Sequence, residues 1–369
     1  MTTIELLEKL VNIDTINDKG NKEILDFIED YLSNLGFKKE YRSKILIMSY
    51  KDNYGIGFLG HSDTVEYIEG WKTNPHELVN RNGILYGLGT SDMKGGIAAF
   101  LKALEETDLS KLSKGIKVYI TYDEEIGFGG IYEVVNKEKN YPEYMIFGEP
   151  TDNRACTACK GLLSLKIYTE GIKVHSSRTD RGRSANSLMI KLLSELEDFY
   201  NNIIKIKEKD IYEVPYTTMN IGLLNGGSAI NSVAKECYSY VDFRLSFEEH
   251  RKIILEKIDE LCKKYYARYE IDEDICPFDN EVEFIKEKNS ASFMTEASFI
   301  DKTKRIILGV GPVTAHEIDE HITVESLNTL VEQYKDIINK TCKKNTTFKV
   351  VFLIYLWYNE YDRRLVWWE

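Results

Sequence analysis

The sequence predicts a mixed α/β fold in which a central sheet flanked by helices is interrupted by a second, α+β domain. Up to about residue 160, short β-favouring apolar runs alternate with amphipathic helical segments. From there to about residue 272, the order of strands and helices is typical of one antiparallel sheet covered by two helices. At 369 residues, the chain is long enough for two hydrophobic cores.

These patterns divide the chain into four segments. We expect a main domain at residues 1–160 and 273–342, an inserted domain at 161–272 and an atypical aromatic tail at 343–369. Apolar residues at helical spacing predict helices at residues 4–13, 24–35, 97–104, 184–200, 248–266 and 323–341. Short apolar runs predict strands at residues 44–48, 55–59, 116–121, 144–147, 162–169, 217–224, 237–244 and 305–308. Asn82-Gly83 has the chemistry of a tight hairpin turn.

Composition excludes some classes of partner. The net charge of −12 argues against nucleic acid, whose binding needs a basic surface. No apolar run approaches the roughly 20 residues of a membrane span, and no secretory leader opens the sequence, so we expect a cytoplasmic protein. Six cysteines are then expected to be reduced, and the lone Cys156–Cys159 pair is interpreted as structural rather than as a zinc or redox site.

Polar residues follow successive predicted strands of the main domain. His61 follows the strand at 55–59, Glu124 and Glu125 follow 116–121, and Glu149 follows 144–147. In open α/β sheets, ligands bind at the carboxyl ends of the strands, so these side chains are expected to meet. Asp92 lies between the first two in the glycine-rich segment 87–96. That segment lacks the ending of a phosphate-binding loop, so its glycines are expected to allow close backbone approach to something compact.

Three consecutive carboxylates, Asp123-Glu124-Glu125, stand at the end of one of these strands. Such a triplet repels itself unless it is solvated or surrounds a cation, and on its own a solvated turn is the ordinary interpretation. Along extended backbone, successive side chains point to opposite faces. We therefore expect Glu124 and Glu125 to point in different directions and to hold different roles.

Together, the candidates form a set of metal ligands. Two histidines and three carboxylates are the donors that zinc, cobalt or manganese accept. Five ligands are too many for one catalytic zinc with an open position, but they suit two metals that share a carboxylate. Asp63 is placed to hold the other ring nitrogen of His61. The expected ligands are His61, Asp92, Glu125, Glu149 and His316, whereas no ligand role is expected for His76, His250 or His321.

Five motifs resemble those of a known family. They are Gly-His-Ser-Asp-Thr-Val (60–65), Leu-Tyr-Gly-Leu-Gly-Thr-Ser-Asp-Met-Lys-Gly (85–95), Asp-Glu-Glu (123–125), Gly-Glu-Pro-Thr (148–151) and Ala-His (315–316). Over about residues 4–342, the chain thus resembles the co-catalytic metallopeptidases and amidohydrolases, which include acetylornithine deacetylases, desuccinylases, carboxypeptidases and aminoacylases. The resemblance implies a zinc-peptidase-like catalytic domain, with residues 161–272 as a lid and dimerisation domain.

The resemblance also implies a role for each candidate residue. His61 and Glu149 would bind one metal, Glu125 and His316 the other, and Asp92 would bridge them. Glu124 matches the general acid/base, and His175 matches a lid residue that reaches the partner subunit's active site and steadies the oxyanion. Asp63 is counted with these catalytic residues because it would hold the ring of His61. The positions expected to contact substrate are Lys160, Asn231, Arg244 and Thr295.

Within the family, the likeness is to the acetylornithine deacetylases, through the segments 214–222, 226–231 and 295–300. It implies a homodimer that hydrolyses a small N-acyl amino acid, N-acetylornithine, to ornithine and acetate, as in arginine biosynthesis. The alternatives left open are a succinyl-diaminopimelate desuccinylase, an acetylcitrulline deacetylase, a dipeptidase or, more remotely, an inactive metal-binding scaffold. The sequence departs from the family after Asn231 and in the tail.

The tail has two interpretations. Residues 350–358 form an apolar and aromatic run, and three of the four tryptophans lie in this tail. It is too short for a membrane span. We expect an ordered extra strand or packing arm in preference to a contact with a partner or membrane surface, because aromatic-rich segments are rarely disordered.

Overall fold

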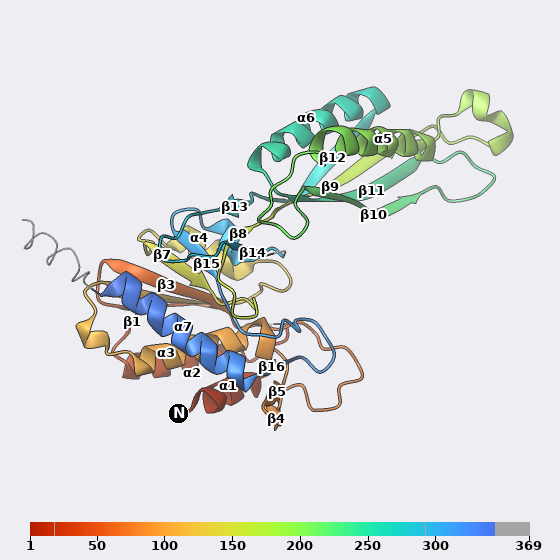
Figure 1. Ribbon diagram of the computed structural model, residues 1–369. Helices are drawn as coiled ribbons and strands as arrows, with labels where there is room; N and C mark the ends of the chain where they lie inside the picture. Colours follow the sequence, from red (N-terminus) through yellow and green to blue (C-terminus); the bar gives the residue numbers. More distant parts are fainter. Residues whose placement is uncertain (18, 292, 344–369) are drawn as a thin grey trace, which may run out of the picture.

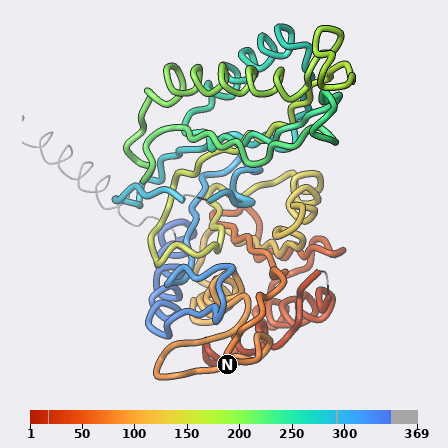
Figure 2. The backbone as a smooth tube through the Cα atoms, turned by 90° about the vertical axis from the view of Figure 1, so that its right-hand side faces the viewer, coloured from red at the N-terminus to blue at the C-terminus, as the bar shows by residue number. Residues whose placement is uncertain are grey.

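The computed structural model describes residues 1–17, 19–291 and 293–343. Its elements form a larger body around a central mixed sheet and a smaller antiparallel body at one end of the molecule (Figure 1). Figure 2 shows the same arrangement after a quarter turn. The predicted order of the tail concerns residues 344–369, which lie outside the described residues. Among the residues described, no helix has the length and hydropathy that a membrane crossing requires.

The central sheet is mixed, as the sequence predicts. Its strands run in the order β1-β2-β6-β3-β7-β15-β8-β13, with β14 beside β8. The neighbours β6, β3, β7 and β15 are parallel, so their carboxyl ends lie at one edge. The bounds are β1 Lys38–Arg42, β2 Leu46–Tyr50, β3 Tyr54–His61, β6 Gly115–Thr121, β7 Tyr144–Phe147, β8 Cys156–Cys159, β13 Phe278–Asp279, β14 Asn289–Ala291 and β15 Lys304–Ile307.

Helices cover both faces of this sheet because its strands alternate between two apolar cores. On β6, Ile116, Val118 and Ile120 belong to one core and Tyr119 to the other. The first core is covered by four helices: α1 Thr3–Val11, α2 Asn21–Asn34, α3 Gly95–Glu106 and α7 Val324–Cys342. The second lies under α4 Gly129–Lys137. The fold is therefore the predicted sheet between two helical layers.

A small three-stranded sheet lies beside the main one. It consists of β4 Val79–Arg81, β5 Ile84–Tyr86 and β16 His321–Thr323. The predicted turn joins β4 to β5, with positive φ angles at Asn82 and Gly83. This sheet brings a segment near the end of the chain against the segment that precedes Asp92.

The smaller body is one antiparallel sheet with two helices on one face, as predicted. Its strand order is β10-β11-β9-β12. The bounds are β9 Gly161–Glu170, α5 Ala185–Phe199, β10 Thr218–Gly226, β11 Glu236–Leu245, α6 Glu248–Tyr265 and β12 Ala267–Ile275. We call residues 161–275 the lid domain, after the role that the resemblance implies for them.

Besides the short strands β13, β14 and β16, three strands were not predicted from the sequence. β1 and β12 are edge strands rich in charged residues, so they lack the apolar run that marks a buried strand. The third, β8, is the Cys156–Cys159 segment itself, and it is buried throughout. Both thiols are free, and burial raises the pKa of Cys159 to about 12, which agrees with the structural interpretation.

Candidate metal centre

The candidate ligands meet at the carboxyl edge of the parallel strands. His61 is the last residue of β3, and Glu149 follows β7, the neighbouring strand. Asp92 lies in the segment that leads into α3. A Cβ atom at Gly96 would lie 2.3 Å from the carbonyl oxygen of Gly148, so only glycine lets α3 begin this close to Glu149. The close backbone approach expected of this glycine-rich segment is thus made at Gly96, against the residue that follows β7.

The candidate ligands form three groups, and within each group one ligand atom of every residue lies within 4.8 Å of the others. The groups are His61-Asp92-Glu149, Asp92-Glu125-His316 and His61-Glu124-Glu125. Asp92 belongs to two of the groups and faces both histidines. Its Oδ1 is 3.0 Å from Nε2 of His61, and its Oδ2 is 3.6 Å from Nε2 of His316. His61 Nε2 is also 3.9 Å from Glu149 Oε2, and His316 Nε2 is 3.1 Å from Glu125 Oε2. A carboxylate with one oxygen directed to each histidine can bridge two cations.

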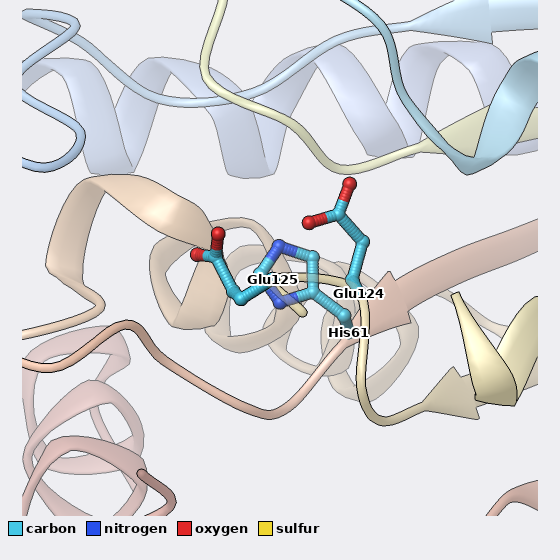
Figure 3. A group of neighbouring side chains, drawn as sticks. All are labelled: His61, Glu124 and Glu125. Carbon is cyan, nitrogen blue, oxygen red and sulfur yellow. The ribbon is translucent and has the colours of Figure 1, made fainter. Parts of the chain in front are cut away.

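The acidic triplet lies in a turn. We expected extended backbone after β6, and that expectation was wrong: Asp123 has φ 63°, and residues 124–127 form a turn that leads to α4. Glu124 and Glu125 lie on either side of the His61 ring in Figure 3, and one carboxylate oxygen of each lies within 4.8 Å of the other. The turn, rather than strand alternation, separates them. Among the described residues, Glu125 bonds His316, whereas the Glu124 side chain has no hydrogen bond or ion pair.

The electrostatics of the cluster suit cations. Burial raises the pKa of Glu149 and of Glu125, and the charge of Asp92 adds to both shifts. The hydrogen bond to Glu125 raises the pKa of His316 to about 9. Oε1 of Glu125 is buried and has no hydrogen-bond partner among the described residues. Buried, unpartnered carboxylate oxygens in a nitrogen-and-oxygen donor set fit divalent metals.

Asp63 connects two of the candidate ligands. Nδ1 of His61 lies 3.1 Å from the backbone oxygen of Asp63 and 3.5 Å from Oδ1 of its side chain. The other carboxylate oxygen, Oδ2, accepts the backbone N–H of Glu125 at 3.2 Å. Asp63 thus orients the imidazole and holds the acidic turn against the end of β3.

The remaining sequence candidates are not among the grouped ligand atoms. His175 and Asn231 are exposed neighbours in the lid domain, where the Ser176 N–H donates to the Asn231 backbone oxygen at 3.0 Å. Neither forms a hydrogen bond or ion pair with the cluster within the described chain. Thr295 is buried, and its hydroxyl accepts the N–H of Ala297 at 2.9 Å.

Lys160 and Arg244 line a second cavity, of about 370 Å³, where the lid domain meets the main domain. Lys160 is 7% exposed and donates to the Tyr216 backbone oxygen at 2.7 Å. Burial lowers the pKa of its amine, and the part of the chain described offers it no ion pair. Arg154 and Lys288 add two more cations to the lining, and Glu213 is the one acid among its described residues. Outside the lining, Asp242 pairs with Arg244 at 3.1 Å and Glu281 with Lys288 at 3.6 Å.

Two buried carboxylates next to the cluster were not among the sequence candidates. Glu296 accepts the Thr121 hydroxyl at 2.9 Å, and burial raises its pKa to about 8. Glu320 accepts three backbone N–H groups from residues 89–92. Glu296 lies inside the segment 295–300, which carries part of the resemblance, and this is the sequence signal by which it could have been found. For Glu320, the signal was only its place four residues after His316.

Comparison with known proteins agrees with this geometry. Residues 157–270 match the family model described as a peptidase dimerisation domain. The chain is 29% identical to an acetylornithine deacetylase of Photorhabdus laumondii, over 93% of this chain and 98% of that one. It is 30% identical to an acetylornithine deacetylase of Yersinia pseudotuberculosis, over 92% and 98%.

Solved structures share the fold. Aminopeptidase PepT from Bacillus cereus superimposes with a TM-score of 0.76 at 20% identity, covering 92% of this chain and 98% of the other. An M20 family metallo-carboxypeptidase from Sulfolobus solfataricus gives 0.72 at 17% identity, with the same coverage. Because the chain matches its relatives over nearly their full length, it belongs to the M20 metallopeptidase family and is a metal-dependent amidohydrolase.

Proposed function

We propose that this enzyme uses two divalent metals to hydrolyse the amide bond of an N-acyl amino acid, with N-acetylornithine as the first candidate. The observation that carries the proposal is Asp92, whose two oxygens face His61 and His316. The choice of N-acetylornithine comes from the relatives, because proteins named acetylornithine deacetylase match this chain over nearly their whole length. The products would be acetate and the free amino acid.

The residues fit two metal positions. His61 and Glu149 would hold one cation, Glu125 and His316 the other, and Asp92 would bridge. When bound, two such cations, with zinc as the first candidate and cobalt or manganese as alternatives, supply an acidified water and a polarised acyl carbonyl. The surrounding side chains bind, orient and exchange protons with the reactants.

Glu124 is the proposed proton carrier. It lines the cavity of about 230 Å³ at the cluster, and its carboxylate has no hydrogen bond or ion pair in the part of the structure that is described. Burial raises its pKa well above the ordinary value, and the charges of Asp92 and Glu125 add to the shift. Such a group accepts a proton from the attacking water and returns it to the leaving amine.

The lid domain would complete the site. His175 is exposed, and its Nδ1 lies 2.9 Å from the Ser177 hydroxyl, which leaves Nε2 free to donate to the oxyanion of the tetrahedral intermediate. We propose that it acts across a homodimer. The match to a dimerisation domain supports this, as does the open edge of β10, where Leu223 and Leu224 are 59% and 53% exposed. Light scattering on the purified protein tests the dimer.

Substrate contacts are proposed for Arg244, Lys160 and Asn231. A guanidinium and a buried amine suit an α-carboxylate, and the exposed lid amide of Asn231 would hydrogen-bond to it. Thr295 is retained as a wall of the site, because its hydroxyl already caps the turn at residues 296–299.

One observation favours a second candidate, an enzyme for N-acyl amino acids that carry an extra carboxylate, such as N-succinyl compounds. The cavity at Lys160 has four cations and one acid in its lining. A succinyl donor would place a second negative charge there, whereas the ammonium of ornithine would be repelled.

A substrate panel tests these proposals. Metal-loaded protein is assayed with N-acetylornithine, N-acetylcitrulline, N-succinyl-diaminopimelate and dipeptides. The first proposal expects the highest kcat/KM with N-acetylornithine, and the second expects it with the succinyl compound. If the protein bound two metals and hydrolysed nothing on the panel, an N-acyl amino acid hydrolase would be the wrong conclusion.

A further inference from the structure

A buried carboxylate outside the proposed mechanism lies directly beneath Asp92. Glu320 is 2% exposed, and its two oxygens accept three backbone N–H groups from the segment that carries Asp92. Oε2 accepts from Gly89 at 2.8 Å, and Oε1 accepts from Ser91 at 2.7 Å and from Asp92 itself at 3.0 Å. Glu320 comes from a segment about 230 residues further along the chain, just before β16.

The same two segments are joined by further hydrogen bonds. The backbone N–H of Gly87 donates to the backbone oxygen of Glu320 at 3.0 Å. The Ser91 hydroxyl accepts the N–H of Thr314 at 3.2 Å and lies 3.4 Å from the Pro312 oxygen. The Thr314 hydroxyl in turn bonds both backbone groups of His321, at 2.7 and 2.9 Å. Residues 87–92 and 311–321 therefore form one hydrogen-bonded unit, which we call the ligand clamp.

The clamp holds two of the proposed metal ligands at once. Asp92 lies at the end of one of its segments and His316 within the other, where His316 has a positive φ of 62°. The side chain of His316 is 56% exposed, so little packing restrains it. The separation of Asp92 from His316 is therefore set mainly by backbone, and the side chains of Glu320 and Ser91 bond the two segments, with Glu320 accepting three of the hydrogen bonds.

The physical reason is the lack of any other acceptor of this strength. Gly89 lies in the left-handed region and Asp92 departs from helical geometry, and the N–H groups of Gly89, Ser91 and Asp92 find their acceptor in Glu320. Hydrogen bonds to a buried carboxylate are charge-assisted and about twice as strong as neutral ones. Without the carboxylate, the three N–H groups would be buried and unpaired, and the segment would relax towards other acceptors.

We propose that Glu320 is a positioning residue for the metal centre: it fixes Asp92 relative to His316, so that the two oxygens of Asp92 serve both metal positions. The inference rests on the proposed two-metal function. It adds that the preorganisation of the bridging ligand comes from one buried carboxylate that contacts neither metal nor substrate.

The test compares Glu320→Gln and Glu320→Asp with Glu325→Gln, a control that removes an exposed carboxylate from the first turn of α7. Glutamine keeps the size of the side chain but offers one acceptor oxygen and places an amide donor against backbone donors. Two properties are measured on chelated protein: the affinity for zinc and cobalt by titration calorimetry, and hydrogen exchange of residues 87–94. Neither depends on substrate.

We expect Glu320→Gln to weaken the second metal equivalent by about 10- to 100-fold, the range typical for residues that orient metal ligands. Exchange of residues 87–94 should become faster in the metal-free protein. We expect kcat to fall with little change in KM, and Glu320→Asp to recover part of the affinity. Glu325→Gln should match wild type throughout.

Wild-type metal affinity and unchanged exchange at residues 87–94 in Glu320→Gln would overturn the proposal. So would an equal loss in Glu325→Gln, because the effect would then be one of overall charge. If Glu320→Gln failed to fold, the milder Glu320→Asp would carry the same measurements. A protein that bound two metals, lost the second on Glu320→Gln and hydrolysed nothing on the substrate panel would leave Glu320 as assigned and contradict only the proposed function.

Discussion

Replacing Glu124 by glutamine should abolish most turnover while leaving the protein and its metals in place. The structure supports this separation because the Glu124 side chain forms no hydrogen bond or ion pair with the residues that are described, so no hydrogen bond or ion pair is lost. Burial raises the pKa of Glu124, so removing the charge should leave the stability unchanged or raise it. Loss of general acid–base catalysis slows a reaction by about 10²- to 10⁴-fold, which corresponds to roughly 3 to 5 kcal/mol of barrier.

The assay is kcat on the best substrate of the panel, with metal content measured on the same sample. The matched control is Asp123→Asn, which removes a carboxylate from the same turn and keeps a residue that tolerates the φ of 63° found there. We expect the control to retain near wild-type kcat, and both variants to bind two metals. If Glu124→Gln kept more than a few per cent of wild-type kcat with both metals bound, the assignment of the proton carrier would be refuted.

Three further predictions concern other groups. Lys117 is 2% exposed and pairs with Glu138 at 2.6 Å and with Glu40 at 2.8 Å. Lys117→Met would leave both carboxylates without their partner, so we expect urea titrations to show a free energy of unfolding lower by about 3 to 5 kcal/mol. The control is the exposed ion pair of Lys111 with Asp108, and Lys111→Met should leave the urea midpoint of unfolding unchanged. Burial raises the pKa of Glu40, but its hydrogen bonds with Lys117, Ser49 and Tyr54 outweigh burial, and the net effect is a lowered pKa. The stabilisation is therefore present above the ordinary pKa and lost as pH falls, so the urea midpoints of wild type and Glu40→Gln should converge between about pH 6 and pH 3. Finally, Cys276 is the one exposed thiol among six, so Ellman's reagent should titrate one cysteine quickly in native protein and five only after unfolding. A second fast thiol, a midpoint gap that persists in acid, or an unaffected Lys117→Met would each contradict the corresponding prediction.

The proximity of the candidate ligands could be predicted from the sequence, because the element that positions each of them is local. His61, Glu125 and Glu149 each follow an apolar run, and parallel strands bring their carboxyl ends to one edge whatever their order in the sheet. Asp92 could be placed because it lies in a glycine-rich segment that leads directly into a helix. Those signals survive in one sequence because each lies within about ten residues of the strand or helix that positions it.

Other features depend on contacts that no local pattern records. The edge strands β1 and β12 carry charged residues and gain their structure from pairing with β2 and β9. The turn at Asp123 was predicted as extended, since a positive φ at aspartate leaves no mark in the sequence. Glu320 resembles any acidic loop residue until the chain folds and places three N–H groups around it.

The most direct test of the central claim is metal reconstitution. Protein stripped by a chelator is titrated with zinc or cobalt while hydrolysis of N-acetylornithine and of the other panel substrates is followed. Because Asp92 faces both His61 and His316, we predict that metal-free protein is inactive and that activity reaches its plateau at two equivalents per chain. Full activity in metal-free protein, or a plateau at one equivalent, would contradict the account.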